Sequence, residues 1–321
     1  MFLLFDLVLI VVLTHPLPYY IYNGGGILSV NDKVVVDDMT KSSGSYNLCY
    51  VSEIQATIPT YLLSYVLPDW DMVSKEEVAV NSNETNNDLS VRDQIYLRQA
   101  NSNAIISAFK SSNNYYEITD INPIVLGKVE EAESDLVIGD EIISIDNIKM
   151  NRLEEITNYI ETKNIGDTLS IKVMNNNKEY ERTVKVKKIE NNKRIGILID
   201  EVINYKTNKK VTFSFKNSEG GPSGGFMISL ALYDYLVDED LSKGLKISGT
   251  GTIDIDGNVG SIGGVKYKLK GAVKKKSDVF FVPNGENYEE AIKLKEKNKY
   301  AIDVVGVSTL DDAINYLKNI D

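Results

Sequence analysis

The 321-residue chain contains one histidine, His15, and one cysteine, Cys49. A Ser–His–Asp triad or a Cys–His pair needs a histidine beside its nucleophile, and His15 directly follows an apolar run, so neither arrangement is expected. Zinc normally takes several histidine or cysteine ligands, so we expect no metal site. A hydrolase with this sequence would therefore rely on Ser, Thr, Lys, Asp, Glu or Tyr.

Positive charge is also scarce, because 35 Lys and Arg residues face 46 Asp and Glu residues, for a net charge of −11. A nucleic-acid-binding protein needs a basic face to neutralise phosphates, so no nucleic-acid partner is expected. Hydrophobic residues make up 43% of the chain, enough for sizeable cores. The length suits two or three domains of roughly 100–150 residues.

Residues 2–13 form an apolar stretch that only Asp6 interrupts. A membrane-spanning helix needs about 20 residues, and a signal peptide would begin with Lys or Arg. Two interpretations stay open: the end of a membrane anchor that starts upstream, or a buried first strand or helix. Pro16 and Pro18 oppose a continuing helix, which favours an anchor over residues 1–15 followed by an extended exit segment.

Residues 16–115 are interpreted as an N-terminal module without a chemical motif. We expect strands at residues 33–36 and 50–57, an exposed loop at the polar tract 81–88, and a helix with apolar spacing over residues 91–110.

A different pattern occupies residues 116–199. A Gly139-Asp140 turn leads into a strand, a helix is expected over residues 153–161, and two further strands are expected at residues 169–174 and 180–186. This order, with the segment GDEIISIDN, resembles a PDZ domain, the alternative being an unrelated small β-rich domain. Asn147 stands where such domains usually have glycine, which is tolerable because asparagine also accepts positive φ. The resemblance implies a groove that adds a peptide strand to a sheet edge.

Residues 200–321 have an α/β pattern. The expected strands are 211–215, 245–247, 252–255, 279–282 and 301–307, and the expected helices are 226–237, 265–275, 289–296 and 310–318. The fold class is therefore α/β (α+β) with several domains.

The segment GGPSGG at residues 220–225 stands between an expected strand and an apolar helix. Such composition often marks a linker, but a linker separates domains rather than joining a strand to the next helix. At this corner, small neighbours let a substrate backbone approach Ser223 closely. The first amides of the following helix lack intrahelical partners and can stabilise an oxyanion. A second glycine-rich region covers residues 248–268 and includes Ser248-Gly249-Thr250 and a Gly-Gly-x-Lys sequence.

Together these segments resemble the proteolytic domain of the Lon family, over about residues 211–284. The family's Gly-Pro-Ser-Ala-Gly motif is matched at residues 221–225, which implies that Ser223 is the nucleophile. Its Ile-Gly-Gly-Leu-Lys-Glu-Lys segment is matched at residues 262–268. Gly224 replaces the alanine, and Gly220 replaces an acidic residue of the ATP-dependent members.

Two lysines compete for the role of general base. On a helix starting at Val265, both Lys266 and Lys268 lie at the margins of the apolar face, so helical spacing cannot choose between them. Only the family resemblance selects Lys268, 45 residues after Ser223 (268 − 223). It also implies that Thr250 makes a hydrogen bond near the lysine. Burial against Val265, Leu269 and Ala272 would give Lys268 the lowered pKa that a base needs.

Nearly the whole chain, from Pro16 onward, resembles the YlbL-type membrane-anchored PDZ–Lon serine endopeptidases of bacteria in its order of segments. This implies an extracytoplasmic catalytic domain that cleaves peptide or protein substrates and takes some of them through the PDZ-like domain. No Gly-x-x-x-x-Gly-Lys-Ser/Thr phosphate loop occurs in the sequence, so ATP-independent cleavage without cofactors is expected. The alternative is a non-catalytic membrane-tethered scaffold that presents peptides. The sequence leaves the substrate and any homo-oligomer open.

Overall fold

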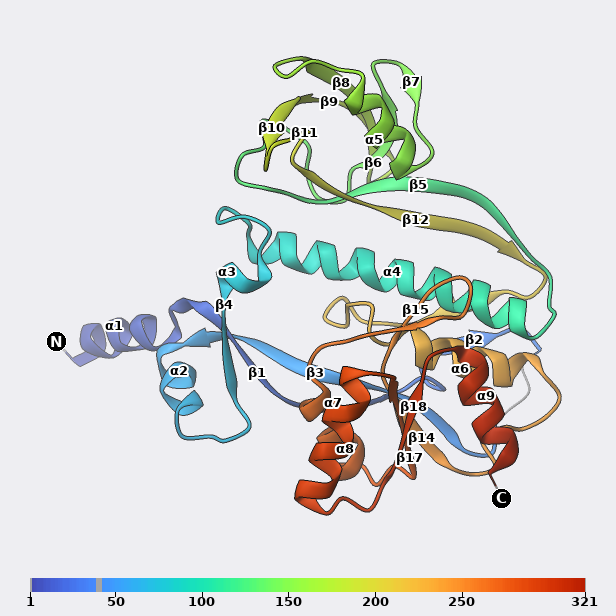
Figure 1. Ribbon diagram of the computed structural model, residues 1–321. Helices are drawn as coiled ribbons and strands as arrows, with labels where there is room; N and C mark the ends of the chain where they lie inside the picture. Colours follow the sequence, from blue (N-terminus) through green and yellow to red (C-terminus); the bar gives the residue numbers. More distant parts are fainter. Residues whose placement is uncertain (1, 39–41, 321) are drawn as a thin grey trace.

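The computed structural model describes residues 2–38 and 42–320 (Figure 1). One sheet has six strands in the order β18 (Asp303–Val307), β17 (Val279–Pro283), β14 (Lys246–Gly249), β3 (Ser45–Thr57), β1 (Pro16–Ser29) and β4 (Asp71–Ser74). The first four run parallel, and β1 and β4 are antiparallel to their neighbours. Residues 16–115, expected as a module of their own, thus complete a sheet that they share with residues 245–307.

Helices cover both faces of this sheet. One face packs against α4 (Asn86–Ser111), α6 (Gly225–Leu236) and α9 (Leu310–Asn319), and the other against α7 (Val265–Lys274) and α8 (Glu286–Asn298). Every residue of β17 is buried, with Phe281 in the first core and Phe280 in the second. A strand covered on both faces needs such a continuous apolar run, which explains Val279–Pro283.

Four short strands and two short helices complete this part of the chain. The strands pair as β2 (Val34–Val36) with β13 (Val211–Phe213) and β15 (Thr252–Ile253) with β16 (Val259–Gly260), and the helices are α2 (Ile58–Ser64) and α3 (Lys75–Val78).

The second sheet belongs to the PDZ-like part, where the expected order of elements is confirmed. Its strands lie in the order β12 (Ile197–Thr207), β5 (Tyr116–Lys128), β6 (Glu141–Ile145), β8 (Thr168–Asn175) and β9 (Lys178–Lys185), with β7 (Ile148–Lys149) beside β6. Helix α5 (Leu153–Glu161) has the expected bounds, and β10 (Lys187–Ile189) pairs with β11 (Asn192–Arg194). Asn147 has a φ of 64°, as its place in the turn requires.

The PDZ-like part is inserted into the chain of the other one. Tyr116 pairs with Thr207, so β5 and β12 form an antiparallel stem that leaves after α4 and returns just before β13. Strand β12 continues across residue 199, where we expected the part to end. The stem lies along α4 (Figure 1).

The polar tract 81–88 differs from the exposed loop that we expected. Glu84 is buried in an ion pair with Arg92, which is also buried and donates to the Leu126 carbonyl oxygen of β5. The expectation is therefore wrong at Glu84, and also from Asn86, where α4 begins.

The N-terminal stretch is a helix, α1 (Phe2–Thr14), in contact with α2. Its side chains Leu7, Ile10 and Val11 are more than half exposed, so a buried first element is wrong. Across residues 2–38 and 42–320, we find no helix that combines the length and the apolar character needed to cross a membrane.

Candidate active site

Ser223 lies in a loop that ends where α6 begins at Gly225. Strand β13 stops at Phe213, two residues earlier than expected, and residues 214–224 form this loop. A Cβ on Gly220 would approach Asp93 of α4 to 2.8 Å, and Gly221 adopts a φ of +89° and donates its amide to the Asp93 carbonyl oxygen. Gly220 needs glycine because the loop runs directly against α4, and Gly221 needs it because a positive φ is strained for other residues. The loop therefore presents Ser223 on a support that α4 provides.

The main chain of Ser223 is fixed from the other side by the second glycine-rich region. The Ser223 carbonyl oxygen accepts hydrogen bonds from Thr250 Oγ1 at 3.1 Å and from the Gly251 amide at 2.8 Å. The Gly251 carbonyl oxygen in turn accepts from the Phe226 amide. The hydrogen bond of Thr250 thus goes to the serine main chain, whereas the family resemblance placed it near the lysine.

Lys268 of α7 reaches Ser223 directly. Its Nζ lies 3.0 Å from Ser223 Oγ in a hydrogen bond, and the lysine is only 4% exposed. Burial lowers its pKa from the ordinary 10.5 to about 8, because a charged ammonium group loses hydration in this position. The Cys49 thiolate would raise this pKa, but burial also raises the pKa of Cys49, to about 12, so the thiol is neutral near pH 7. A serine hydrogen-bonded to a buried lysine with a lowered pKa has the geometry that a nucleophile–base pair requires.

Lys266, the competing lysine, points the other way. Its Nζ forms an ion pair with Asp71, and its side chain is 43% exposed. Lys270 similarly pairs with Asp69. The structure therefore brings Lys268, and not Lys266, to Ser223.

Strands β1 and β3 determine where α7 sits. A Cβ on Gly271 would come within 3.1 Å of the Gly26 main chain, so the helix backbone packs directly on β1. Val265, Leu269 and Ala272 fill a core together with Cys49 of β3. The apolar surroundings of Lys268 thus include β3, in addition to the neighbours on its own helix that the sequence suggested.

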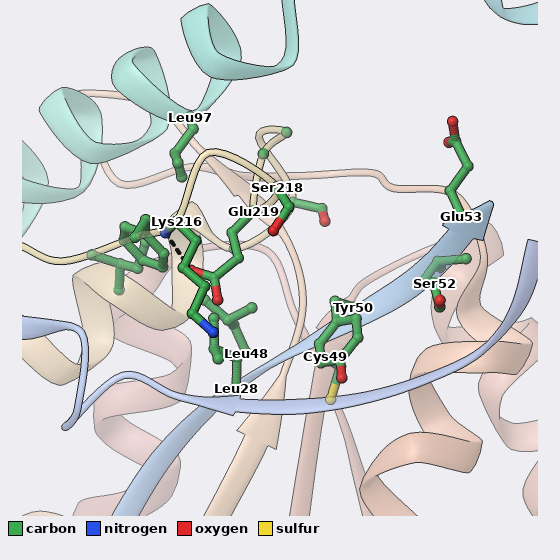
Figure 2. A pocket seen from close by; sticks show the side chains of 17 residues that line it. Leu28, Leu48, Cys49, Tyr50, Ser52, Glu53, Leu97, Lys216, Ser218 and Glu219 are labelled. Atoms are coloured by element: carbon green, nitrogen blue, oxygen red, sulfur yellow. Dashed lines mark hydrogen bonds between the residues drawn. The ribbon is translucent and has the colours of Figure 1, made fainter. Parts of the chain in front are cut away.

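A cavity of about 340 Å³ opens beside Ser223. Figure 2 shows Leu97 reaching in from α4, Tyr50 and Glu53 from β3, and Lys216 and Glu219 from the loop before the serine. Residues 16–115 carried no chemical motif, so sequence reasoning missed the contribution of β3 and α4. Nothing in Tyr50 or Leu97 as residue types marks them as cleft residues.

Two amides at the start of α6 are already used. The Gly225 amide donates to the Pro222 carbonyl oxygen at 3.2 Å, and the Phe226 amide donates to the Gly251 carbonyl oxygen at 3.1 Å. Neither acceptor lies in α6, as expected for the first amides of a helix, but both amides are occupied and neither is available to an oxyanion. Among the described residues, the amides of Ser223 and Gly224 have no acceptor. These two are the donors available next to Ser223 Oγ. No group of three or more His, Cys, Asp and Glu side chains within the described ranges could hold a metal ion.

Comparison with protein families gives two matches. Residues 216–319 match the Lon protease (S16) C-terminal proteolytic domain, and residues 116–186 match the PDZ domain. The first match contains both Ser223 and Lys268. The second covers β5 to β9 of the inserted part.

Curated relatives point the same way. The chain is 30% identical over 95 residues to a Lon protease of Aster yellows witches'-broom phytoplasma (30% of this chain, 12% of that protein). It is 25% identical over 192 residues to a Lon protease of Campylobacter jejuni (56% and 22%), and 33% identical over 100 residues to Lon protease 2 of Borreliella burgdorferi (31% and 12%). The chain thus spans less than a quarter of the length of each of these relatives.

Among solved structures, the PDZ domain of an SdrC-like protein from Listeria monocytogenes is 26% identical, with a TM-score of 0.23, over 26% of this chain and 92% of that one. The second domain of the Listeria protein Lin2157 is 29% identical, with a TM-score of 0.20, over 27% and 88%. At these scores we draw nothing from either likeness. The family matches and the curated relatives support a protease, and the chain carries a PDZ domain followed by a Lon-type C-terminal proteolytic domain, which is consistent with a PDZ–Lon protease.

Proposed function

We propose that this chain is an ATP-independent serine endopeptidase that acts at the outer face of a bacterial membrane, with Ser223 as nucleophile and Lys268 as general base. The observation that carries the proposal is the 3.0 Å contact between Ser223 Oγ and a lysine that is 4% exposed. A surface lysine would stay charged at neutral pH and could not accept a proton from serine.

In the proposed reaction, neutral Lys268 takes the proton of Ser223 Oγ as this oxygen attacks the carbonyl carbon of the scissile peptide bond. The amides of Ser223 and Gly224 donate to the oxyanion that forms. Lys268 then gives its proton to the departing amine, which leaves an acyl ester on Ser223. Water, with Lys268 again as base, hydrolyses the ester. The hydrogen bonds of Thr250 and Gly251 to the Ser223 carbonyl oxygen keep the nucleophile in place throughout.

A serine-reactive fluorophosphonate probe tests this mechanism. The full-length protein should be labelled at Ser223, Ser223→Ala should not be labelled, and Lys268→Arg should lose labelling because guanidinium stays protonated. Lys266→Arg is the matched control and should be labelled like the wild type. Labelling that survives in Lys268→Arg would rule out the Ser–Lys pair. A wild-type protein that neither reacts with the probe nor cleaves peptides would instead favour the alternative, a non-catalytic membrane-tethered scaffold that presents peptides.

Substrate capture is proposed for the PDZ domain, which by its fold adds an extended peptide to a sheet edge. Strand β12 lies at one edge of the domain's sheet. Deleting the inserted domain, residues 116–207, across the paired ends Tyr116 and Thr207 should spare probe labelling and weaken the cleavage of long substrates. Equal cleavage of long substrates after the deletion would refute a selecting role.

Independence from ATP is proposed because the 321 residues contain no phosphate-loop sequence. The purified chain should cleave an unstructured peptide at the same rate with and without ATP and Mg²⁺. A rate that rises with ATP would contradict the proposal.

Membrane attachment is proposed for α1 and its neighbour α2. Their exposed apolar side chains include Leu7 and Ile10 on α1, Leu62 on α2, and Tyr65 and Val66 just after it, the last 75% exposed. A patch of this kind is costly in water and suits a membrane interface. Protease added to intact cells should then digest the catalytic domain. Protection until the membrane is broken would place this domain on the other side.

A further inference from the structure

A second cavity, of about 490 Å³, lies between α4 and the stem strand β12. Leu97 and Asn101 line it from α4, Asn204 and Tyr205 from β12, and Phe213 from β13. It is separate from the cleft at Ser223, and no step of the proposed mechanism uses it.

The two cavities meet at Leu97, which lines both of them. The rings of Phe213 and Phe215 stack with their centroids 6.1 Å apart, and Phe215 lines the Ser223 cleft while Phe213 lines the second cavity. One leucine is therefore shared by the two cavities, and one stacked aromatic pair contributes a ring to each.

Strand β12 connects the second cavity to the PDZ domain. It starts at Ile197, next to the PDZ core, and its later residues Asn204 and Tyr205 line the cavity. Within the described residues β12 pairs with β5 alone, so its other edge is not part of a sheet. A chain bound near the start of β12 would meet this cavity before it reached Ser223.

The lining suits a polypeptide. Side-chain amides of Asn101 and Asn204 can bond main-chain N–H and C=O groups of any sequence, and Tyr205 and Phe213 offer apolar surface. The Gln94 amide, which also lines the cavity, already donates to the Asn217 and Glu219 carbonyl oxygens. The Asn101 Oδ1 atom is buried and has no donor among the described residues. A buried carbonyl oxygen of this kind normally has a partner, and rotation of the Asn101 side chain into the cavity would bring it to a peptide N–H.

We propose that this cavity binds an extended segment of the substrate polypeptide and guides it from the PDZ domain across Leu97 into the Ser223 cleft. The inference rests on the proposed peptidase function. It assigns the cavity to long substrates alone, because a peptide of a few residues fills only the cleft beside Ser223.

Kinetics with two substrates test the inference on the full chain. In Asn101→Leu and in Asn204→Trp, kcat/KM for unfolded casein should fall roughly tenfold, the effect of losing about 1.4 kcal/mol of binding. A fluorogenic tetrapeptide should be cleaved at the wild-type rate, because neither asparagine lines the Ser223 cleft. Asn315→Leu, at an exposed position on α9, is the matched control and should change neither rate.

Crosslinking provides a second test that does not depend on rates. In a Ser223→Ala background, Asn204→Cys should form a disulfide with an unfolded polypeptide that carries one activated cysteine, and Asn315→Cys should not. The native thiol Cys49 is 1% exposed, and Ser223→Ala alone measures its background. Equal crosslinking at both positions, or equal loss on both substrates in the kinetics, would overturn the inference. A wild-type protein that cleaves neither substrate would refute the proposed function instead.

Discussion

The strongest test of the Ser–Lys pair is the pH dependence of cleavage. Burial lowers the pKa of Lys268 from 10.5 to about 8. At pH 7 about a tenth of the lysine is then neutral, whereas at a pKa of 10.5 only about one molecule in 3,000 would be. The neutral fraction of the lysine thus differs roughly 300-fold between the two pKa values, which corresponds to about 3 kcal/mol at 1.36 kcal/mol per pKa unit.

The assay is kcat/KM for a short fluorogenic peptide between about pH 6 and pH 10.5, since this quantity reports the pKa values of the free enzyme. The rate should rise about tenfold per pH unit at low pH and level off above about pH 8, because a base is active only after it loses its proton. Lys268→Arg should show no such rise with pH, and its kcat/KM should be roughly a thousandfold or more below that of the wild type. Lys266→Arg is the control and should keep the wild-type profile, since Lys266 pairs with Asp71 away from Ser223.

A flat profile across this range would refute the assignment of Lys268 as base. A midpoint close to 10.5 would leave Lys268 as the base but refute the argument that burial tunes it. Activity that survives in Lys268→Arg and disappears in Lys266→Arg would transfer the role to the other lysine.

Three further predictions concern the support of the site. Lys268→Met should raise the free energy of unfolding at pH 7 by about 1–3 kcal/mol, because the lowered pKa means that the folded state disfavours the charged lysine. In urea unfolding, the difference in stability between Lys268→Met and the wild type should shrink as pH rises from about 8 to 10.5, where the lysine of the folded wild type is neutral. Thr250→Val should lower kcat roughly tenfold with KM nearly unchanged, because the Ser223 carbonyl oxygen loses one hydrogen-bond donor. A rise in KM with an unchanged kcat would contradict this. Gly271→Ala should reduce stability by about 1–3 kcal/mol, because its Cβ would press on the Gly26 main chain at 3.1 Å, and an unchanged melting temperature would show that α7 can move away.

The elements that the sequence predicted well depend on neighbours along the chain. The helix over residues 153–161 was expected within its observed bounds because Ile156 and Ile160 stand four apart and face the PDZ core. The strand at residues 279–282 was evident from an unbroken apolar run. Local periodicity contains the information in both cases.

Contacts between distant segments could not be predicted in this way. The parallel pairing of β3 with β14 joins Ser45 to Lys246, and no residue type in either strand names its partner. Glu84 reads as part of a polar loop, yet it is buried because Arg92, two helical turns along, pairs with it. A charge that is buried by its partner cannot be recognised from composition alone.

The candidate site is built from the chain segments on both sides of the inserted PDZ domain. Residues 220–268 supply the serine and the lysine, but Cys49 of β3 and Gly26 of β1 form the wall against which α7 buries Lys268. Without that wall the lysine would be hydrated and its pKa would stay near 10.5, because only burial lowers it. The residues that bury Lys268 therefore include strands that precede the insertion, and the proposed catalytic residues, Ser223 and Lys268, follow it. Since Tyr116 and Thr207 lie side by side, the insertion leaves this joint sheet undisturbed.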